Sequence, residues 1–169
     1  YAGMGTTLVM AVLHGDTLVA GHVGDSRGYR WRDGALVQLT RDHSLLQEQI
    51  DIGLITAEEA AVSGNRNLVT RALGVEDTVL VDLQEVPLQA GDLYLLCSDG
   101  LTDMVDSEVV QSVVDDKRTE LPRAAAELVD LANQNGGRDN ISVILVRVPP
   151  EFLPSSGWAQ RFLARKKGG

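Results

Sequence analysis

At the centre of this chain lies the run Leu93-Tyr94-Leu95-Leu96-Cys97-Ser98-Asp99-Gly100. Its uninterrupted apolar part predicts a buried strand. The strand ends abruptly at an acid followed by glycine. A carboxylate at the end of a buried strand needs a cation or hydrogen-bond donors to offset its lost hydration. The run therefore predicts a central strand with a polar site at its end.

Two further apolar runs meet an aspartate in the same way. Residues 18–23 lead into Gly24-Asp25-Ser26, and Asp139-Asn140 leads into the run 141–146. Each motif alone has an ordinary explanation as a turn or a helix-to-strand loop. Together they predict that the acids gather at one rim of a β core. Such oxygen-only clusters suit hard cations, magnesium or manganese.

Composition limits the classes of function. The chain has 169 residues, enough for one compact domain, and its hydrophobic content of 44% is ordinary for a globular protein. Its net charge of −9 excludes nucleic acid as the expected partner, because a phosphate backbone requires a basic face. No apolar run approaches a membrane span, and no secretory signal is visible. Cys97 is expected in the core, which is compatible with a cytoplasmic monomer.

The order of periodic segments predicts an α+β fold. Strands are expected over 6–13, 17–23, 27–32 and 35–39, joined as a four-stranded antiparallel meander. The first is expected to be buried on both faces, and Asp33-Gly34 is a strong hairpin turn signal. Segment 44–74 is less apolar and is expected to leave the core; within it, Thr56 and Glu59 form a capping-box pattern.

The second half of the chain is expected to return to the core. Strands are predicted over 79–86, 92–97 and 141–148, with two helices between the last two. Their expected apolar stripes are Val109, Val110, Val113, Val114 and Leu121, Ala125, Leu128, Ala132. This order excludes a βαβ repeat of the Rossmann type. Residues 1–150 are taken as the domain. For the basic tail 151–169 a solvated segment is favoured over a peripheral membrane contact.

Six motifs together resemble the metal-dependent protein phosphatases (the PPM, or type 2C, family), more narrowly the bacterial serine/threonine branch. In chain order they are Gly3-Met4-Gly5-Thr6-Thr7, Val23-Gly24-Asp25-Ser26-Arg27, Leu39-Thr40-Arg41-Asp42-His43-Ser44, Asn67-Leu68-Val69-Thr70-Arg71-Ala72-Leu73-Gly74, Ser98-Asp99-Gly100-Leu101 and Gly136-Gly137-Arg138-Asp139-Asn140. A single motif is weak evidence, whereas six in the family's order are specific.

The resemblance implies an α-β-β-α sandwich of two antiparallel sheets flanked by helix pairs. It implies Mn²⁺ or Mg²⁺, two or three ions in a complete domain, with Asp99 and Asp139 on one ion and Asp99 and Asp25 on another. It also implies that a metal-activated water hydrolyses phosphoserine and phosphothreonine in proteins, without a catalytic side chain as nucleophile. The implied partners are phosphoproteins, including a Ser/Thr kinase and its targets. Segment 44–74 matches the family's flap.

Other residues of these motifs are expected to support the acids. Asn140 is expected to position Asp139 or its loop, and Gly100 allows close backbone approach. Asp42 is expected to hydrogen-bond loop amides and brace the flap, and Arg27 to serve as an ion-pair partner. The chain's histidines do not match the family's proton donor, and we take the motif containing His43 as structural.

One departure from the family pattern matters. The bridging aspartate of an upstream Asp-Gly pair and the phosphate-binding arginine have no match here. We expect them before Tyr1, and therefore expect this chain to be an N-terminally truncated domain with weak metal binding and little activity alone. The alternatives are a non-catalytic phosphatase-like module that binds a partner and an unrelated α+β domain. Retention of Asp25, Asp99 and Asp139 favours the enzyme.

Overall fold

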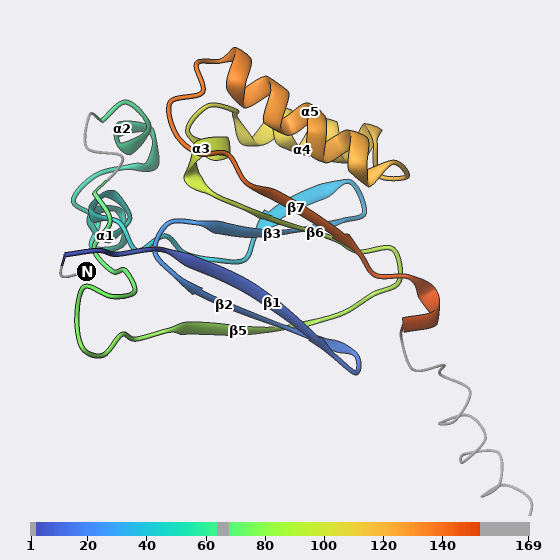
Figure 1. Cartoon of the computed structure of the whole chain (residues 1–169), viewed down its shortest axis with the longest axis horizontal. Coiled ribbons are helices and arrows are strands. Elements are labelled where there is room, and N and C mark those ends of the chain that lie inside the picture. Colours follow the sequence, from blue (N-terminus) through green and yellow to red (C-terminus); the bar gives the residue numbers. More distant parts are fainter. Residues whose placement is uncertain (1–2, 64–67, 153–169) are drawn as a thin grey trace, which may run out of the picture.

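The protein is described from a computed structural model, which covers residues 3–63 and 68–152 (Figure 1). Two antiparallel sheets form its centre. One sheet has the order β1-β2-β5, from Leu8–His14, Thr17–Val23 and Asp82–Pro87. The other has the order β4-β3-β6-β7, from Ala35–Gln38, Arg27–Arg32, Leu93–Cys97 and Val143–Arg147. The α+β class and the two antiparallel sheets are therefore confirmed.

Helices cover one outer side of this sandwich. α3 (Asp99–Thr102), α4 (Ser107–Asp116) and α5 (Leu121–Gln134) pack on the sheet that contains β6, as Figure 1 shows. The short helices α1 (Leu45–Asp51) and α2 (Ala57–Ala61) lie apart from them. A 3₁₀ turn, Pro150–Phe152, follows β7. None of the helices in the described ranges is long and apolar enough to cross a membrane.

Strand β6 is buried on both sides, as its sequence predicts. Leu93, Leu95 and Cys97 belong to the core beneath the helices. Tyr94 points the other way, into the core between the two sheets. Burial raises the pKa of the Cys97 thiol to about 12, so this cysteine behaves as a small core residue and not as a nucleophile.

The expected four-stranded meander is wrong. Strands β1 and β2 form the predicted hairpin, and so do β3 and β4, but β2 pairs with β5 and β3 with β6. The chain changes sheets at Gly24-Asp25-Ser26. Hydrophobic alternation shows which face of a strand is buried but does not specify its distant neighbour.

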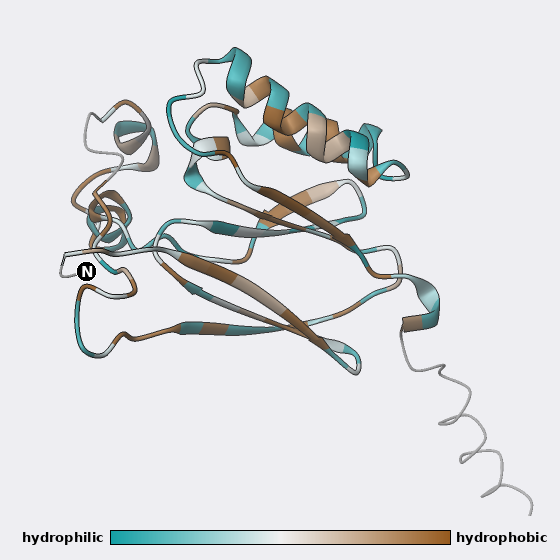
Figure 2. Cartoon of the chain, in the orientation of Figure 1, coloured by the Kyte–Doolittle hydropathy of each residue, from teal (hydrophilic) through white to brown (hydrophobic). Residues whose placement is uncertain are grey.

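The expectation that the first strand is buried on both faces is also wrong. Leu8, Met10 and Val12 are 41–46% exposed, and they alternate with partly buried residues. The strand is an edge of its sheet, and no described segment covers its outer face. Figure 2 shows this hydrophobic strand on the outside of the sandwich. Leu83 of β5 is 69% exposed and extends the same apolar face over Gly21.

The helical stripes need smaller corrections. In α4 the buried residues are Val110, Val113 and Val114, while Val109 is 42% exposed. In α5 Ala124 is fully buried in place of Ala125. Each stripe differs from the prediction only in its N-terminal part, since the other predicted residues of α4 and Leu128 and Ala132 of α5 are buried. Strands β5 and β7 begin later than predicted, and the short helix α3 was not expected.

Segment 44–74 leaves the sandwich and returns to it. The Thr56/Glu59 capping box is present at the start of α2. Isolated bridges join Ser44 to Val69 and Thr6 to Leu73, so both ends of the segment are attached near the sheets. Most of its predicted loop at 63–67, like the tail at 153–169, lies outside the described residues.

Candidate metal centre at the end of strand β6

Asp99 is the first residue of α3, directly after β6. Its side chain accepts a hydrogen bond of 2.9 Å from the Gly100 amide. A β carbon at Gly100 would come within 2.5 Å of the Asn140 carbonyl oxygen. Glycine is therefore required here for the close backbone approach that the sequence predicts. This contact brings the loop of Asp139 against the start of α3.

Ser98 ties the same two loops together. Its hydroxyl donates to the Asn140 carbonyl at 2.8 Å and accepts from the Ser142 amide at 3.0 Å. Asp139 in turn accepts from the Asn140 amide at 2.6 Å, and its side chain is exposed. The sequence expectation that Asn140 orients Asp139 is consistent with this geometry. Ser98 belongs to the Ser-Asp-Gly motif, but its position beside Asp99 gives no sequence signal of this role in joining the two loops.

Asp25 sits at the crossing between β2 and β3 and is only 8% exposed. Burial and, next, the negative charge of Asp99 raise the pKa of its carboxyl to about 6, with smaller contributions from Asp42 and Asp103. No ion pair is formed by Asp25 within the described part of the chain. The structure therefore holds a buried carboxylate among other acids, which is unfavourable unless a cation joins them.

Gly24 and His43 hold the Asp25 turn. The Gly24 amide donates to Nδ1 of His43 at 3.0 Å, and the His43 amide donates to the Gly24 carbonyl at 2.9 Å. Gly24 has a φ of 103°, and a β carbon there would lie 2.3 Å from Cγ2 of Thr7. No other residue fits this position without displacing the turn.

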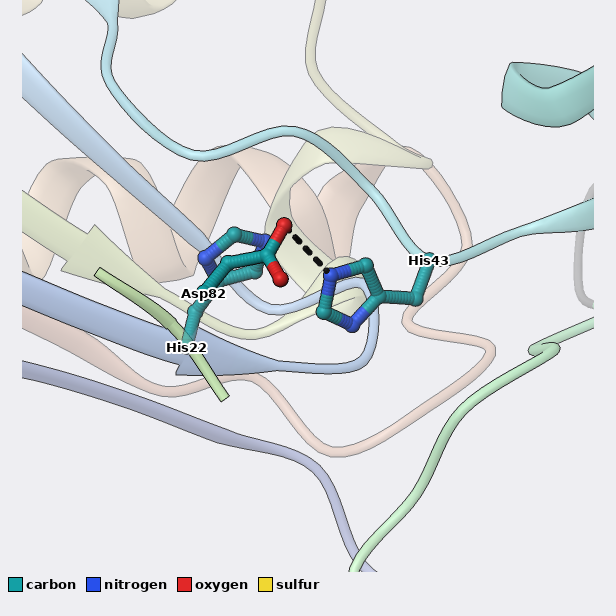
Figure 3. A group of neighbouring side chains, drawn as sticks. All are labelled: His22, His43 and Asp82. Atoms are coloured by element: carbon teal, nitrogen blue, oxygen red, sulfur yellow. Dashed lines mark ion pairs between the residues drawn. The ribbon is translucent and has the colours of Figure 1, made fainter. Parts of the chain in front are cut away.

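His22, His43 and Asp82 form a compact group beside this turn (Figure 3). The two rings stack with centroids 4.5 Å apart. Nε2 of His43 lies 3.2 Å from Asp82, and the Arg71 guanidinium donates to the same carboxylate at 2.8 Å. The group joins β2, the start and end of segment 44–74, and β5.

This histidine group has the right residue types for a metal site but the wrong surroundings. Because Nδ1 of His43 accepts the Gly24 amide, its Nε2 carries the proton and cannot bind a metal. Nε2 of His22 lies 2.7 Å from the Arg41 carbonyl and donates to it. The Arg71 cation adds repulsion. The group therefore has a structural role, as the sequence interpretation of the His43 motif predicts, although nothing in the sequence identified Asp82.

Asp42 braces the site through side chains, not through the loop amides that we expected. The Arg27 guanidinium donates to it through Nε and Nη2, with a shortest contact of 2.6 Å, and Gln38 donates at 3.1 Å. The prediction that Arg27 is an ion-pair partner is confirmed. With its oxygens engaged in this way, Asp42 supports the turn between the sheets.

The three remaining acids fit a hard cation. Asp25, Asp99 and Asp139 offer only oxygen ligands, and none of them has an ion-pair partner within the ranges that the structure describes. Magnesium and manganese prefer such ligands. Within those ranges the three do not lie within 4.8 Å of one another as a single group, unlike the histidine group. Asp99 is close enough to Asp25 to raise the pKa of that carboxyl, and Gly100 beside it meets the Asp139–Asn140 backbone, which suits sharing of Asp99 between neighbouring ions.

A cavity of about 300 Å³ adjoins the centre. It lies between segment 44–74 and the start of the helical layer, and its lining includes Leu46, Gln47, Thr102, Asp103 and Asp106. Carboxylates at its rim favour a ligand with positive charge near this point.

Comparisons with known proteins identify the family to which this arrangement of acids and sheets belongs. Residues 2–141 match the family model described as protein phosphatase 2C. The chain belongs to this family. Among curated proteins, a serine/threonine phosphatase (stp) of Listeria monocytogenes is 47% identical over 144 residues, which is 85% of this chain and 57% of that phosphatase.

Solved type 2C phosphatases share the fold. A serine/threonine phosphatase of Mycobacterium tuberculosis, PstP/Ppp, is 41% identical with a TM-score of 0.83, over 87% of this chain and 61% of that structure. A catalytic domain of PstP in complex with two manganese ions is 41% identical with a TM-score of 0.77, over 87% and 60%. The chain thus spans about three fifths of these relatives' structures.

Proposed function

We propose that this chain supplies part of a manganese- or magnesium-dependent site that hydrolyses phosphoserine and phosphothreonine in proteins. The observation that carries the proposal is the set of acids at the crossing of the two sheets and at the end of β6 that form no ion pair with any described residue, above all the buried Asp25 beside Asp99. The relatives named as serine/threonine phosphatases, and the two manganese ions of PstP, support it.

The roles of the chain's own residues follow from their positions. Asp99 and Asp139 would hold one ion, and Asp99 and Asp25 another. When bound, such ions supply Lewis acidity, which lowers the pKa of water and offsets charge on a phosphate. Ser98, Gly100 and Asn140 keep the Asp139 loop against the start of α3, which would hold the Asp139 carboxylate near Asp99 for a shared ion.

The substrate side of the site is the cavity between segment 44–74 and α3. Its carboxylates, Asp103 and Asp106, would attract a peptide with basic residues near the phosphorylated side chain. Segment 44–74 would act as the flap over this peptide. The phosphoproteins of a Ser/Thr kinase, including the kinase itself, are the substrates we infer.

The first test measures manganese binding by calorimetry. Asp99→Asn and Asp139→Asn are expected to weaken binding at least tenfold, since each removes an anionic ligand. Asp77→Asn is a matched control, because Asp77 is exposed and remote in sequence from these loops. Binding that is unchanged in both site variants would contradict the assignment.

The second test measures hydrolysis. We expect this chain alone to hydrolyse p-nitrophenyl phosphate slowly with manganese, and a longer protein, which also carries the N-terminal segment of the Listeria phosphatase, to hydrolyse it much faster and to accept phosphothreonine peptides. If the longer protein binds manganese but hydrolyses neither substrate, the non-catalytic binding module is the better description.

A further inference from the structure

A second cavity, of about 350 Å³, lies at the other end of β6. Its lining comes from the ends of β3, β6 and β7, the turn before β6, and the turn between α4 and α5. Asp99 lies seven positions after Asp92, a residue of the cavity wall, which corresponds to about 23 Å along an extended chain. The cavity is therefore separate from the candidate metal centre, and what it binds goes beyond the proposed function.

The floor of this cavity is set by strand register. Trp31 of β3 faces Leu93 of β6, and Leu93 faces Arg147 of β7. Residues paired directly across neighbouring strands project from the same face of a sheet, so these three side chains form a row on the helix side. Arg118 and Thr119 reach the cavity from the α4–α5 turn.

The wall beside this row is rigid and electrically neutral. Arg32 donates to both oxygens of Asp92 at 2.6 Å, and Asp92, only 1% exposed, also accepts from the Gln89 amide and from the Tyr94 hydroxyl. The Gln111 side chain joins α4 to the β3–β4 turn at 3.1 Å. The Asp92 side of the cavity is therefore held in shape by paired side chains.

The remaining charge of the cavity is positive. Arg147 has no hydrogen-bond or ion-pair partner within residues 3–63 and 68–152, and Arg118 contacts Asp115 through Nη1 alone. Among the lining residues only Asp33 opposes them, since Asp92 is neutralised by Arg32. Two cationic side chains converging on one hollow are unusual in a chain whose net charge is −9.

Trp31 lines the cavity with its ring. The indole nitrogen of Trp31 is buried and makes no hydrogen bond. A buried N–H without an acceptor is unfavourable, and the neighbouring hollow gives this ring room to adjust when the cavity is filled. Thr119 adds a hydroxyl to the lining. Two guanidinium groups with a neighbouring hydroxyl suit a doubly charged anion that has several acceptor oxygens.

We propose that this cavity binds a small molecule that carries a phosphate monoester. Arg147 and Arg118 contact the phosphate, and Trp31, Leu93 and the neutral wall contact the organic part. The volume lies at the lower end of the range for small-molecule sites, about 300–1,000 Å³, and favours a compact ligand.

Trp31 is also the reporter for the test. The chain has two tryptophans, and in a Trp158→Phe background only Trp31 fluoresces. Inorganic phosphate and glycerol 3-phosphate are titrated up to about 10 mM at constant ionic strength, with a chelator present so that the metal centre does not contribute. We expect saturable fluorescence changes, with the ester binding more tightly than inorganic phosphate.

Charge variants identify the site. Arg147→Gln and Arg118→Gln are each expected to weaken binding about tenfold, the effect of losing one charge-assisted hydrogen bond. Arg123→Gln is the matched control, because Arg123 is an exposed arginine that pairs with Glu120 outside the cavity. No saturable response, or a response unchanged in both cavity variants, would overturn the proposal. Equal affinity for the two ligands would overturn the role of the organic part.

Discussion

Replacing Asp25 by asparagine tests whether this carboxylate is a metal ligand or a structural acid. Asn keeps the shape of the side chain and removes its charge. At neutral pH without metal, Asp25 is a buried anion close to Asp99, and we therefore expect Asp25→Asn to be more stable than the wild type. A structural carboxylate behaves in the opposite way, because its loss leaves donors or cations without a partner.

The magnitude follows from the pKa. The folded protein holds Asp25 at about 6 in place of its ordinary 3.8. At 1.36 kcal/mol per pH unit this difference corresponds to about 3 kcal/mol, and solvent screening at the rim of the site reduces it to about 1–2 kcal/mol. Because the folded state binds the proton more tightly, the penalty is absent below about pH 4, grows up to about pH 6 and is constant above it.

The assay is urea unfolding followed by circular dichroism, in chelator at pH 8 and at pH 4. We expect the variant to gain about 1–2 kcal/mol at pH 8 and nothing at pH 4. With saturating manganese the order at pH 8 should reverse, because only the wild type retains this ligand. Asp77→Asn is the control and should change stability by less than about 0.5 kcal/mol. A variant that is less stable than wild type in chelator at pH 8 would refute the reasoning.

Three further predictions concern the supports of the site. Gly100→Ala should destabilise the protein by about 1–3 kcal/mol and weaken manganese binding, because the added β carbon displaces the Asn140 carbonyl. Urea unfolding and manganese calorimetry on the same preparation test both effects. Asp42→Asn should lower the free energy of unfolding by about 2–4 kcal/mol with or without manganese, since Arg27 loses a bidentate partner. A loss of stability seen only with metal would instead identify Asp42 as a metal ligand. Burial lowers the pKa of His43, so below about pH 6.5 the unfolded state binds the proton first and the free energy of unfolding falls as pH falls. His43→Gln should therefore flatten this part of the stability–pH profile measured by urea unfolding, and an unchanged slope would mean that another group causes it.

The sequence predicted individual elements better than their partners. Strands β2 and β3 were predicted with their observed bounds, because apolar runs and glycine-containing turns are local signals. The meander failed at Gly24, where the chain crosses between sheets. That crossing depends on a φ of 103° and on contacts with Thr7 and His43, which no local pattern reports.

In the candidate site, too, the sequence predicted individual residues better than their partners. The acids were recognised because each interrupts or ends an apolar run. The histidine group was not assembled from sequence, because its members come from β2, the loop before α1, and β5, and pair only after the sheet forms. The partner of Asp42 was missed for a similar reason, since Arg27 lies on another strand and not in the loop.

The bare outer face of β1 has a consequence for handling the protein. The net charge of −9 makes separate molecules repel one another. The exposed apolar side chains of this face favour association between two molecules; they are Leu8, Met10, Val12 and Leu83. Added salt shortens the range of the repulsion, to about 3 Å at 1 M, and leaves the attraction intact. The preparation should therefore scatter more light as salt rises, and a Met10→Lys variant should stay clear. Colloidal stability of this chain thus depends on the solvent more than on its fold.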